Sequence, residues 1–234
     1  MNILIINQPP FNRGDESAHK GLIRTLLKRF PDAKIKVMHE AWLSESYRQY
    51  AVKDKRVEYF SEQQGCIKFP RFRNHDVFTN HTWLWKWHPT YRWTERIYKW
   101  ADIVVCAPGG ICMGGFQDWN HLYHLRLAQL FKRPLAYYGR SFGPFPTETE
   151  RNRQFKKISL DMLHYFGYLS IRDHKTELLA DELNIPYIST IDSAFLDSPK
   201  VEIPYELKSV VGNKPYMVFV PNYLLWHYAY KGRI

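Results

Sequence analysis

Apolar runs and amphipathic stretches alternate along the first 200 residues of the chain. Four or more consecutive apolar residues, as in 103–106, predict a strand that is buried on both faces of a sheet. Apolar residues that recur every three or four positions, as in 16–30 before Pro31, predict a helix. In chain order we predict strands at 2–7, 35–38, 57–60, 103–106, 135–138, 168–171 and 187–191, and helices at 16–30, 43–50, 90–100, 122–131, 148–166 and 175–183.

Strands that alternate with helices at this spacing predict an α/β fold with a Rossmann-like, doubly wound and mostly parallel sheet. Right-handed crossovers place the carboxyl ends of all parallel strands along one edge of the sheet. Ligands of open α/β sheets bind in the crevice beyond those ends. We therefore expect any binding site of this chain at the carboxyl edge.

The pattern also predicts a domain boundary near residue 197. Residues 1–197 contain all the regular alternation and are expected to form the Rossmann-like domain. Residues 198–215 are rich in proline and show little periodicity, which is typical of a linker. The apolar run at 216–220 begins a new strand, so 216–234 is expected to be the start of a truncated second domain.

Charge and cysteine content narrow the class of protein. The chain has 33 basic and 23 acidic side chains, a formal net charge of +10, which favours anionic partners without choosing among nucleic acid, lipid and phosphorylated small molecules. Its three cysteines form no CxxC pair, as expected in a reducing compartment. No signal peptide or membrane-spanning run is evident, so we expect a cytoplasmic protein, with peripheral contact at the inner membrane face left open.

The stretch 68–100 holds five of the eight tryptophans, interleaved with basic residues. Such a segment can stack on bases or sugar rings, or lie at a membrane surface. The alternative is that the rings pack into the core while the charges are solvated. The sequence leaves both interpretations open.

Four loops with small, polar or basic residues are expected to meet at the carboxyl edge: 12–15, 109–115, 139–144 and 172–173. Glycines, a serine hydroxyl and guanidinium groups can hold an anionic ligand closely. The alternative for 139–144 taken alone is an ordinary Gly-Pro turn after a core strand, but several loops of the same character at successive strand ends count against it. The double glycine at 109–110 matches neither the dinucleotide fingerprint nor a Walker A loop, and the histidines lack metal-ligand spacing, so we expect neither a nucleotide cofactor nor a metal.

Three charged residues in these loops each allow a structural and a functional interpretation. Asp15 stands where a helix N-cap is expected, or supplies a carboxylate that acts as an acid, a base or a hydroxyl acceptor. Arg172 binds a ligand carboxylate or phosphate, or pairs with a structural partner such as Asp192. Asp173 precedes a helix and could cap it.

Five segments follow one another along the chain: Asn12-Arg13-Gly14-Asp15, Asp102 to Gly110, Tyr138 to Phe145, Leu169 to Asp173, and Asp192 to Phe195. Taken together and in this order, they resemble the polysaccharide pyruvyl transferase family over roughly residues 1–197. The resemblance implies two Rossmann-like domains that face a cleft, as in GT-B glycosyltransferases. It implies transfer of a pyruvyl group from phosphoenolpyruvate to a lipid- or nucleotide-linked saccharide in cell-surface polysaccharide biosynthesis, without a further cofactor or nucleic acid.

The resemblance also implies roles for particular residues. Asp15, Arg172 and Asp173 would be catalytic, although the position of Arg140 is commonly glutamine in the family. The family's second domain supplies basic residues and a histidine, and this chain holds only its start, so inactivity of the truncated chain is one expectation. Alternatives are a GT-B glycosyltransferase that uses a nucleotide sugar and a non-enzymatic basic module that binds polyanions. The implied substrate-binding residues are Asn12, Gly14, Gly109, Gly110, Arg140 and Ser141.

Overall fold

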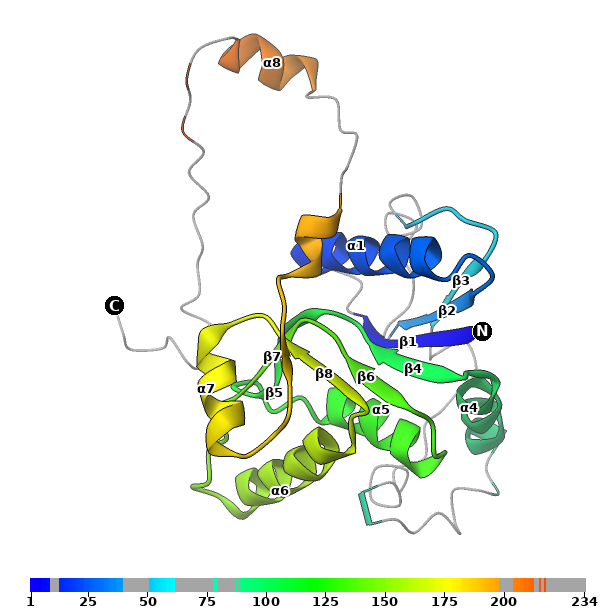
Figure 1. The fold of residues 1–234 in the computed structure, drawn as a ribbon, viewed down its shortest axis with the longest axis vertical. Coiled ribbons are helices and arrows are strands. Elements are labelled where there is room, and N and C mark those ends of the chain that lie inside the picture. The colour runs from blue at the N-terminus through cyan, green and yellow to red at the C-terminus, as the bar shows by residue number, and fades with distance from the viewer. Residues whose placement is uncertain are drawn as a thin grey trace. The chain divides into compact units, whose positions relative to one another are not determined.

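The computed structural model describes residues 1–8, 13–39, 51–61, 78–79, 87, 89–197, 204–212, 215 and 217. The chain divides into two compact units, Met1–Asp197 and Ser198–Ile234. The first unit is a layered α/β structure with helices on both faces of a sheet (Figure 1).

A seven-stranded sheet with the order β3-β2-β1-β4-β6-β8-β9 forms the centre of this unit, and every pairing between its described strands is parallel. This arrangement confirms the predicted Rossmann-like, doubly wound class. Its strands are β1 (Asn2–Gln8), β2 (Lys34–His39), β3 (Val57–Ser61), β4 (Ile103–Cys106), β6 (Leu135–Tyr137), β8 (Tyr168–Ile171) and β9 (Ile188–Ser189). Its helices are α1 (Arg13–Arg29), α4 (Pro89–Trp100), α5 (Trp119–Leu130), α6 (Glu150–Tyr165), α7 (His174–Glu182) and the short 3-10 helix η3 (Ser193–Leu196).

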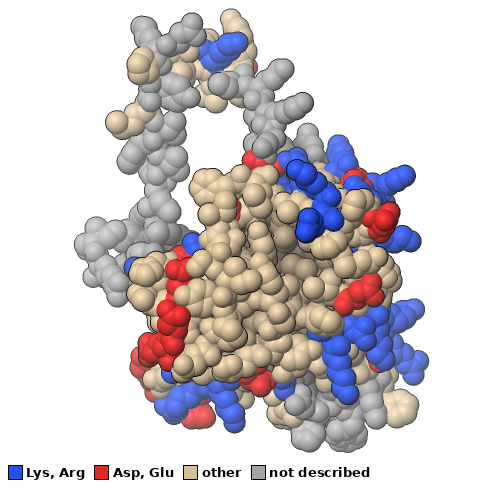
Figure 2. Space-filling model, in the orientation of Figure 1, with Lys and Arg blue, Asp and Glu red and all other residues tan. Residues whose placement is uncertain are grey.

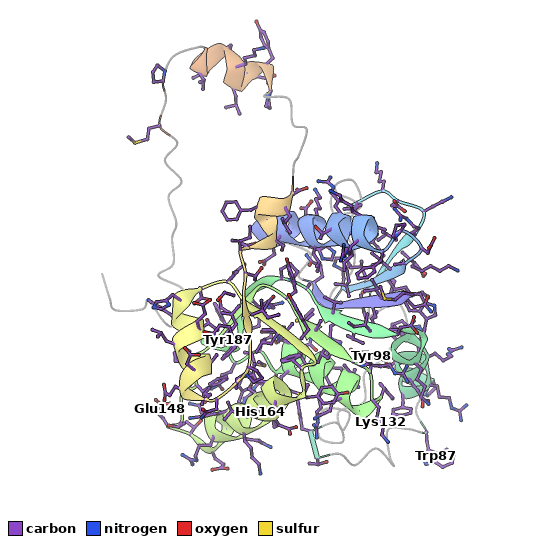
Figure 3. All side chains as sticks on the ribbon, in the orientation of Figure 1. Trp87, Tyr98, Lys132, Glu148, His164 and Tyr187 are labelled. Carbon is purple, nitrogen blue, oxygen red and sulfur yellow. The ribbon has the colours of Figure 1, made fainter. Side chains whose placement is uncertain are left out.

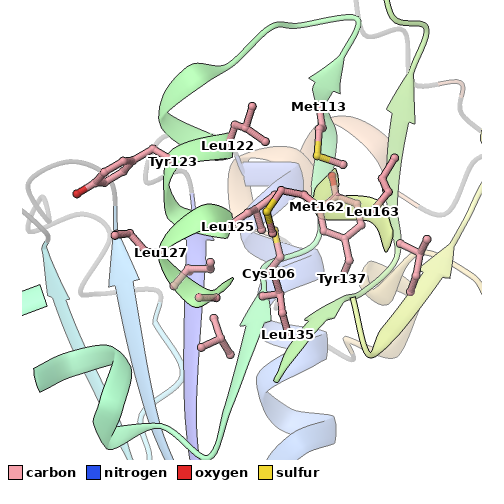
Figure 4. Close-up of a cluster of buried hydrophobic side chains, with 14 of the residues drawn as sticks. Cys106, Met113, Leu122, Tyr123, Leu125, Leu127, Leu135, Tyr137, Met162 and Leu163 are labelled. Atoms are coloured by element: carbon pink, nitrogen blue, oxygen red, sulfur yellow. The ribbon is translucent and has the colours of Figure 1, made fainter. Parts of the chain in front are cut away.

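The two faces of β1 pack against different helices, which explains why its sequence is apolar without interruption. Ile3 and Ile5 belong to a core shared with α1. Leu4 and Ile6 belong to a second, larger core shared with α4, α5 and α6. Figure 4 shows the part of this larger core in which Cys106, Tyr137 and the leucines of α5 meet.

A second parallel sheet of two strands, β5 (Gly109–Gly114) and β7 (Arg140–Gly143), was not predicted. The sequence analysis expected loops here, and this expectation is wrong. Glycine is rare in strands, so the glycines of β5 and β7 argued against a strand in the sequence. In the structure Gly114 lies opposite Gly143, and an added Cβ on Gly114 would overlap the backbone of Gly143. The glycines allow the two strands to approach.

Other differences concern the ends of elements. Helix α1 begins at Arg13, three residues before its predicted start, and β9 is reduced to two exposed residues at the sheet edge. Helix α8 (Tyr205–Val211), which has no buried residue, lies within the predicted linker. The predicted helix at 43–50 lies outside the described residues, as does most of the strand predicted at 216–220. The assignment of 198–234 to a linker and a second domain stays a prediction.

Candidate active site

Three of the predicted segments meet at the carboxyl edge around Gly109, the first residue of β5. An added Cβ on Gly109 would lie 3.2 Å from both the Asp15 Oδ1 and the Arg140 Nη2, so these two groups flank the glycine. Arg172, which follows β8, and Asp192, which precedes η3, are near enough to act electrostatically on Asp15. We call Asp15, Gly109, Arg140, Arg172 and Asp192 the Asp15 cluster.

Arg140 is the buried cation of this cluster, with an exposed fraction of only 1%. Its Nη1 donates to the carbonyl of Ala107 at 2.6 Å, and its Nη2 lies 3.3 Å from the carbonyl of Gly110 and 3.1 Å from the sulfur of Cys112. These bonds tie β7 to β5 and to the turn that precedes it. The guanidinium therefore brings its positive charge to the site from below the surface, and direct contact with a ligand stays a prediction.

Asp15 lies inside the first turn of α1, because the helix begins at Arg13. The predicted N-cap position is therefore wrong. Burial raises the pKa of the Asp15 carboxyl, the guanidiniums of Arg140 and Arg172 lower it, and the charge of Asp192 raises it again, with a net rise. The result is a carboxyl group that keeps its proton to a higher pH than an ordinary aspartate, beside two cations.

Arg172 pairs with Asp192, which was one of the two interpretations of this residue. The ion pair is accessible, because the side chains of Arg172 and Asp192 are 22% and 29% exposed. Asp192 is also held by η3, since its Oδ1 accepts a hydrogen bond from the amide of Ala194 at 2.9 Å. Arg172 therefore has a fixed partner and still faces the carboxyl edge.

Asp173 caps α7, which confirms the structural interpretation of this residue. Its carboxylate accepts hydrogen bonds from the amide of Thr176 at 3.0 Å, from the Thr176 hydroxyl and from the Ser141 hydroxyl. Burial raises the pKa of Asp173, but the bonds from Ser141 and Thr176 outweigh it and the pKa lies below the ordinary value. Asp173 thus stays ionised and orients the hydroxyl of Ser141.

Contact between α1 and η3 was missed by the sequence analysis. The two elements touch at Gly21, where an added Cβ would overlap the carbonyl of Ser193, and the Ser193 hydroxyl donates to the carbonyl of Ala18 at 2.7 Å. An ion pair between Arg24 and Asp197 closes the same interface. This contact holds Asp192 on the same side as Asp15. An isolated glycine inside a helical pattern was the available signal.

The structure describes two of the three remaining predicted site residues, Gly14 and Gly110. Gly14 lies exposed in the first turn of α1, and an added Cβ on Gly110 would meet nothing within 4 Å, so the surface is open there. Asn12 lies outside the described residues. Within the described parts of the chain, no three His, Cys, Asp or Glu side chains lie close enough to hold a metal ion.

The tryptophan-rich segment is divided between the core and the surface. In α4, Trp93 packs edge-on against Phe60 with ring centroids 5.9 Å apart, and Trp100 is half-buried. Trp87 is 71% exposed and lies at the periphery of the molecule (Figure 3). Trp83 and Trp85 lie outside the described residues. A contact between this segment and a ligand stays a prediction.

Comparison with known proteins agrees with the motifs. The sequence profile of the family described as polysaccharide pyruvyl transferase matches residues 12–231 of the 234-residue chain, a range that includes the whole Asp15 cluster. No curated protein matches the chain significantly. The profile match covers far more than half of the sequence, and the chain therefore belongs to the polysaccharide pyruvyl transferase family.

Proposed function

We propose that this protein transfers a pyruvyl group from phosphoenolpyruvate to a hydroxyl-bearing saccharide at the Asp15 cluster. The observation that carries the proposal is the position of Asp15, a half-buried carboxyl with a raised pKa, beside the guanidiniums of Arg140 and Arg172. Phosphoenolpyruvate carries two anionic groups and an enol methylene that must be protonated. The cluster offers cations for the first need and an acid for the second.

Asp15 donates a proton in the first step of the reaction and recovers one in the second. The π electrons of the enol take the Asp15 proton at the methylene carbon, which leaves positive charge on the central carbon. A sugar hydroxyl adds to that carbon and returns its proton to Asp15. The carbon–oxygen bond to phosphate then breaks, and a second hydroxyl closes a cyclic ketal while its proton goes to the departing phosphate.

The other predicted residues support these steps. Arg172 is partly exposed and can exchange Asp192 for the phosphate or carboxylate of the donor. Arg140 stabilises negative charge from below Gly109 and Gly110. Asp173 is assigned to positioning Ser141, whose hydroxyl would contact a substrate oxygen. Asn12 and Gly14 are assigned to substrate binding, and we place the enzyme in the cytoplasm, where phosphoenolpyruvate is made.

Phosphate release tests this proposal. The purified protein is incubated with phosphoenolpyruvate and a panel of nucleotide- and lipid-linked saccharides, and inorganic phosphate and ketal formation are measured. Arg172→Ala and Asp15→Asn should each lower the rate by about 100-fold or more, as expected when a transition-state charge contact or the acid is lost. Arg153→Ala removes an exposed guanidinium that pairs with Glu150 on α6, and should leave the rate unchanged.

Two results would contradict the proposal. Unchanged turnover in Arg172→Ala would remove this residue from the site. No saccharide-dependent phosphate release by the wild-type protein with any acceptor would exclude the reaction itself.

A further inference from the structure

The amino edge of the sheet, opposite the Asp15 cluster, is a continuous surface built from the first residues of neighbouring strands. Backbone hydrogen bonds join these residues: the amide of Lys34 donates to the carbonyl of Met1 at 2.9 Å, and the amide of Ile35 donates to that of Arg56 at 2.8 Å. The amide of Asp102 donates to the carbonyl of Asn2 at 2.8 Å. The starts of β1, β2, β3 and β4 therefore lie side by side.

This edge carries unpaired positive charge. Helix α1 ends at this edge with Lys28 and Arg29, and Lys132 follows the end of helix α5. Lys34 begins β2, and Lys55 lies in the turn before β3. Lys28, Arg29, Lys34, Lys55 and Lys132 are all exposed and form no ion pair among the described residues. We call these five the amino-edge cations. Asp32, Asp102 and Glu58 are exposed carboxylates on the same edge, and Glu58 pairs with Lys36, which is not one of the five.

Charge is distributed unevenly over the molecule. Figure 2 shows Lys and Arg side chains gathered on the side where β2, β3 and α4 lie, and Asp and Glu side chains along α7. The chain has a net charge of +10, and on this edge the five amino-edge cations outnumber the exposed carboxylates Asp32, Glu58 and Asp102. Such asymmetry orients a protein toward an anionic surface.

The amino edge also has hollows and exposed apolar side chains. A hollow of about 380 Å³ is lined by Lys34, Lys36, Lys55, Arg56 and Trp100 among others, and a second of about 590 Å³ adjoins it between Pro31 and Arg56.

Met1 is 46% exposed and Phe30 is 41% exposed on the same edge. The ring of Trp100 is covered by the Lys36 ammonium, whose Nζ lies 4.7 Å from the ring centroid.

These features favour a lipid surface over a nucleic acid. Binding of single-stranded nucleic acid without sequence preference depends on exposed aromatic faces that stack on bases, and the Trp100 face is already occupied. Long lysine side chains beside exposed apolar groups are typical of proteins that lie on a bilayer, where about four to eight basic residues recognise anionic headgroups. No helix in the described residues is long and apolar enough to cross a membrane.

We propose that the amino-edge cations, with Met1 and Phe30, bind the surface of an anionic bilayer. The Asp15 cluster then faces away from the lipid, at a distance of about one strand, roughly 20 Å for a seven-residue strand such as β1. A lipid-linked acceptor would have to extend that far before its sugar reaches the cluster, a consequence that rests on the proposed function. The binding itself does not, because it needs neither donor nor acceptor.

Sedimentation with vesicles tests the proposal. The wild-type protein should sediment with vesicles that contain about one third phosphatidylglycerol and not with pure phosphatidylcholine, and raising NaCl from 50 to 500 mM should weaken binding at least tenfold. The triple variant Lys28→Glu, Lys34→Glu, Lys55→Glu should also lose at least tenfold. Phe30→Ser should weaken the binding that remains at high salt.

A matched control variant distinguishes the effect of where the charges lie from the effect of the total net charge. Lys156→Glu, Lys157→Glu, Lys175→Glu reverses three charges on α6 and α7, so it lowers the net charge by the same amount. This variant should bind at least threefold more tightly than the amino-edge variant. Circular dichroism and thermal unfolding show whether each variant is folded, and Lys→Gln versions of the same triplets replace any that is not.

Three outcomes would overturn the proposal: no binding of the wild-type protein to anionic vesicles, equal loss in the two triple variants, or tighter binding of a single-stranded oligonucleotide than of vesicles. Failure of the reaction would be seen separately, since phosphate release is measured with a water-soluble acceptor. The amino-edge variant should retain that release.

Discussion

Asp15 and Arg140 flank the bare α-carbon of Gly109, one from the first turn of α1 and the other from the start of β7. Both groups lie 3.2 Å from the point where a Cβ would stand, so a larger residue here would require them to move by a few tenths of an ångström. The glycine thus allows a half-buried carboxyl and a buried guanidinium to share one face of the carboxyl edge. The chemistry proposed for the site depends on that proximity.

Gly109→Ala tests this relationship. The added methyl group should push the Asp15 carboxyl and the Arg140 guanidinium apart by a few tenths of an ångström. We expect kcat to fall about tenfold or more, because small displacements of catalytic groups are costly, with a loss of stability of about 1 kcal/mol. Phosphate release and urea unfolding measure the two effects.

Gly167→Ala is the control for this change. An added Cβ at Gly167 would lie 4.0 Å from the nearest atom, the carbonyl oxygen of Leu135, so both activity and stability should be close to those of the wild type. A normal kcat in Gly109→Ala would show that the spacing of Asp15 and Arg140 does not matter for turnover.

Asp192→Asn tests the electrostatic link between Asp192, Arg172 and Asp15. The charge of Asp192 raises the pKa of Asp15, so its removal should lower that pKa. If Asp15 acts as the acid, the rate falls as pH rises through its pKa, and the variant's falling limb should move to lower pH. Arg172 would also lose its anionic partner, so the KM for phosphoenolpyruvate should fall by about threefold to tenfold.

The pH profile of kcat and the KM for the donor measure these effects. Asparagine keeps the side-chain oxygen that accepts from Ala194, so η3 should stay capped. An unmoved alkaline limb together with a raised KM would contradict the assignment of both Asp15 and Arg172.

The buried side chain of His39 makes stability depend on pH. Burial lowers the pKa of His39 to about 4, while its unfolded value is near 6.5, so the folded state binds fewer protons between these values. Stability should therefore fall as pH drops below 6.5, by up to about 1.4 kcal/mol per pH unit for this residue, until the pH reaches the folded pKa. Urea unfolding at pH 7, 6 and 5 measures the slope.

His39→Phe removes the titrating group and keeps a ring of similar size against Tyr59, with which His39 stacks at 6.1 Å. The variant should show a shallower slope over the same range. Some slope should remain, because burial also lowers the pKa values of His19 and His121. An unchanged slope would mean that folding leaves the pKa of His39 near its unfolded value.

Much of the fold was predictable because buried parallel strands require continuous apolar runs. The strands at 103–106 and 168–171 have the predicted bounds, and the sheet class was confirmed. The strands β5 and β7 were not predictable by this reasoning. Their glycines allow the two backbones to approach closely, and their sequences contain no continuous apolar run. Helix α8 was missed because it has only seven residues and lies in a stretch with Pro199, Pro204 and Pro215, which is typical of a linker.

The sequence by itself determined the order of the elements, the faces that they bury and, through five motifs, the family. It placed Asp15, Gly109, Arg140 and Arg172 along one edge, because parallel strands share a direction. Only the tertiary structure decided that Arg140 is buried, that Arg172 pairs with Asp192 and that Asp173 holds Ser141. The reason is physical: burial and ionic partners depend on distances in space between residues that are far apart in the chain, and local patterns carry no such distances.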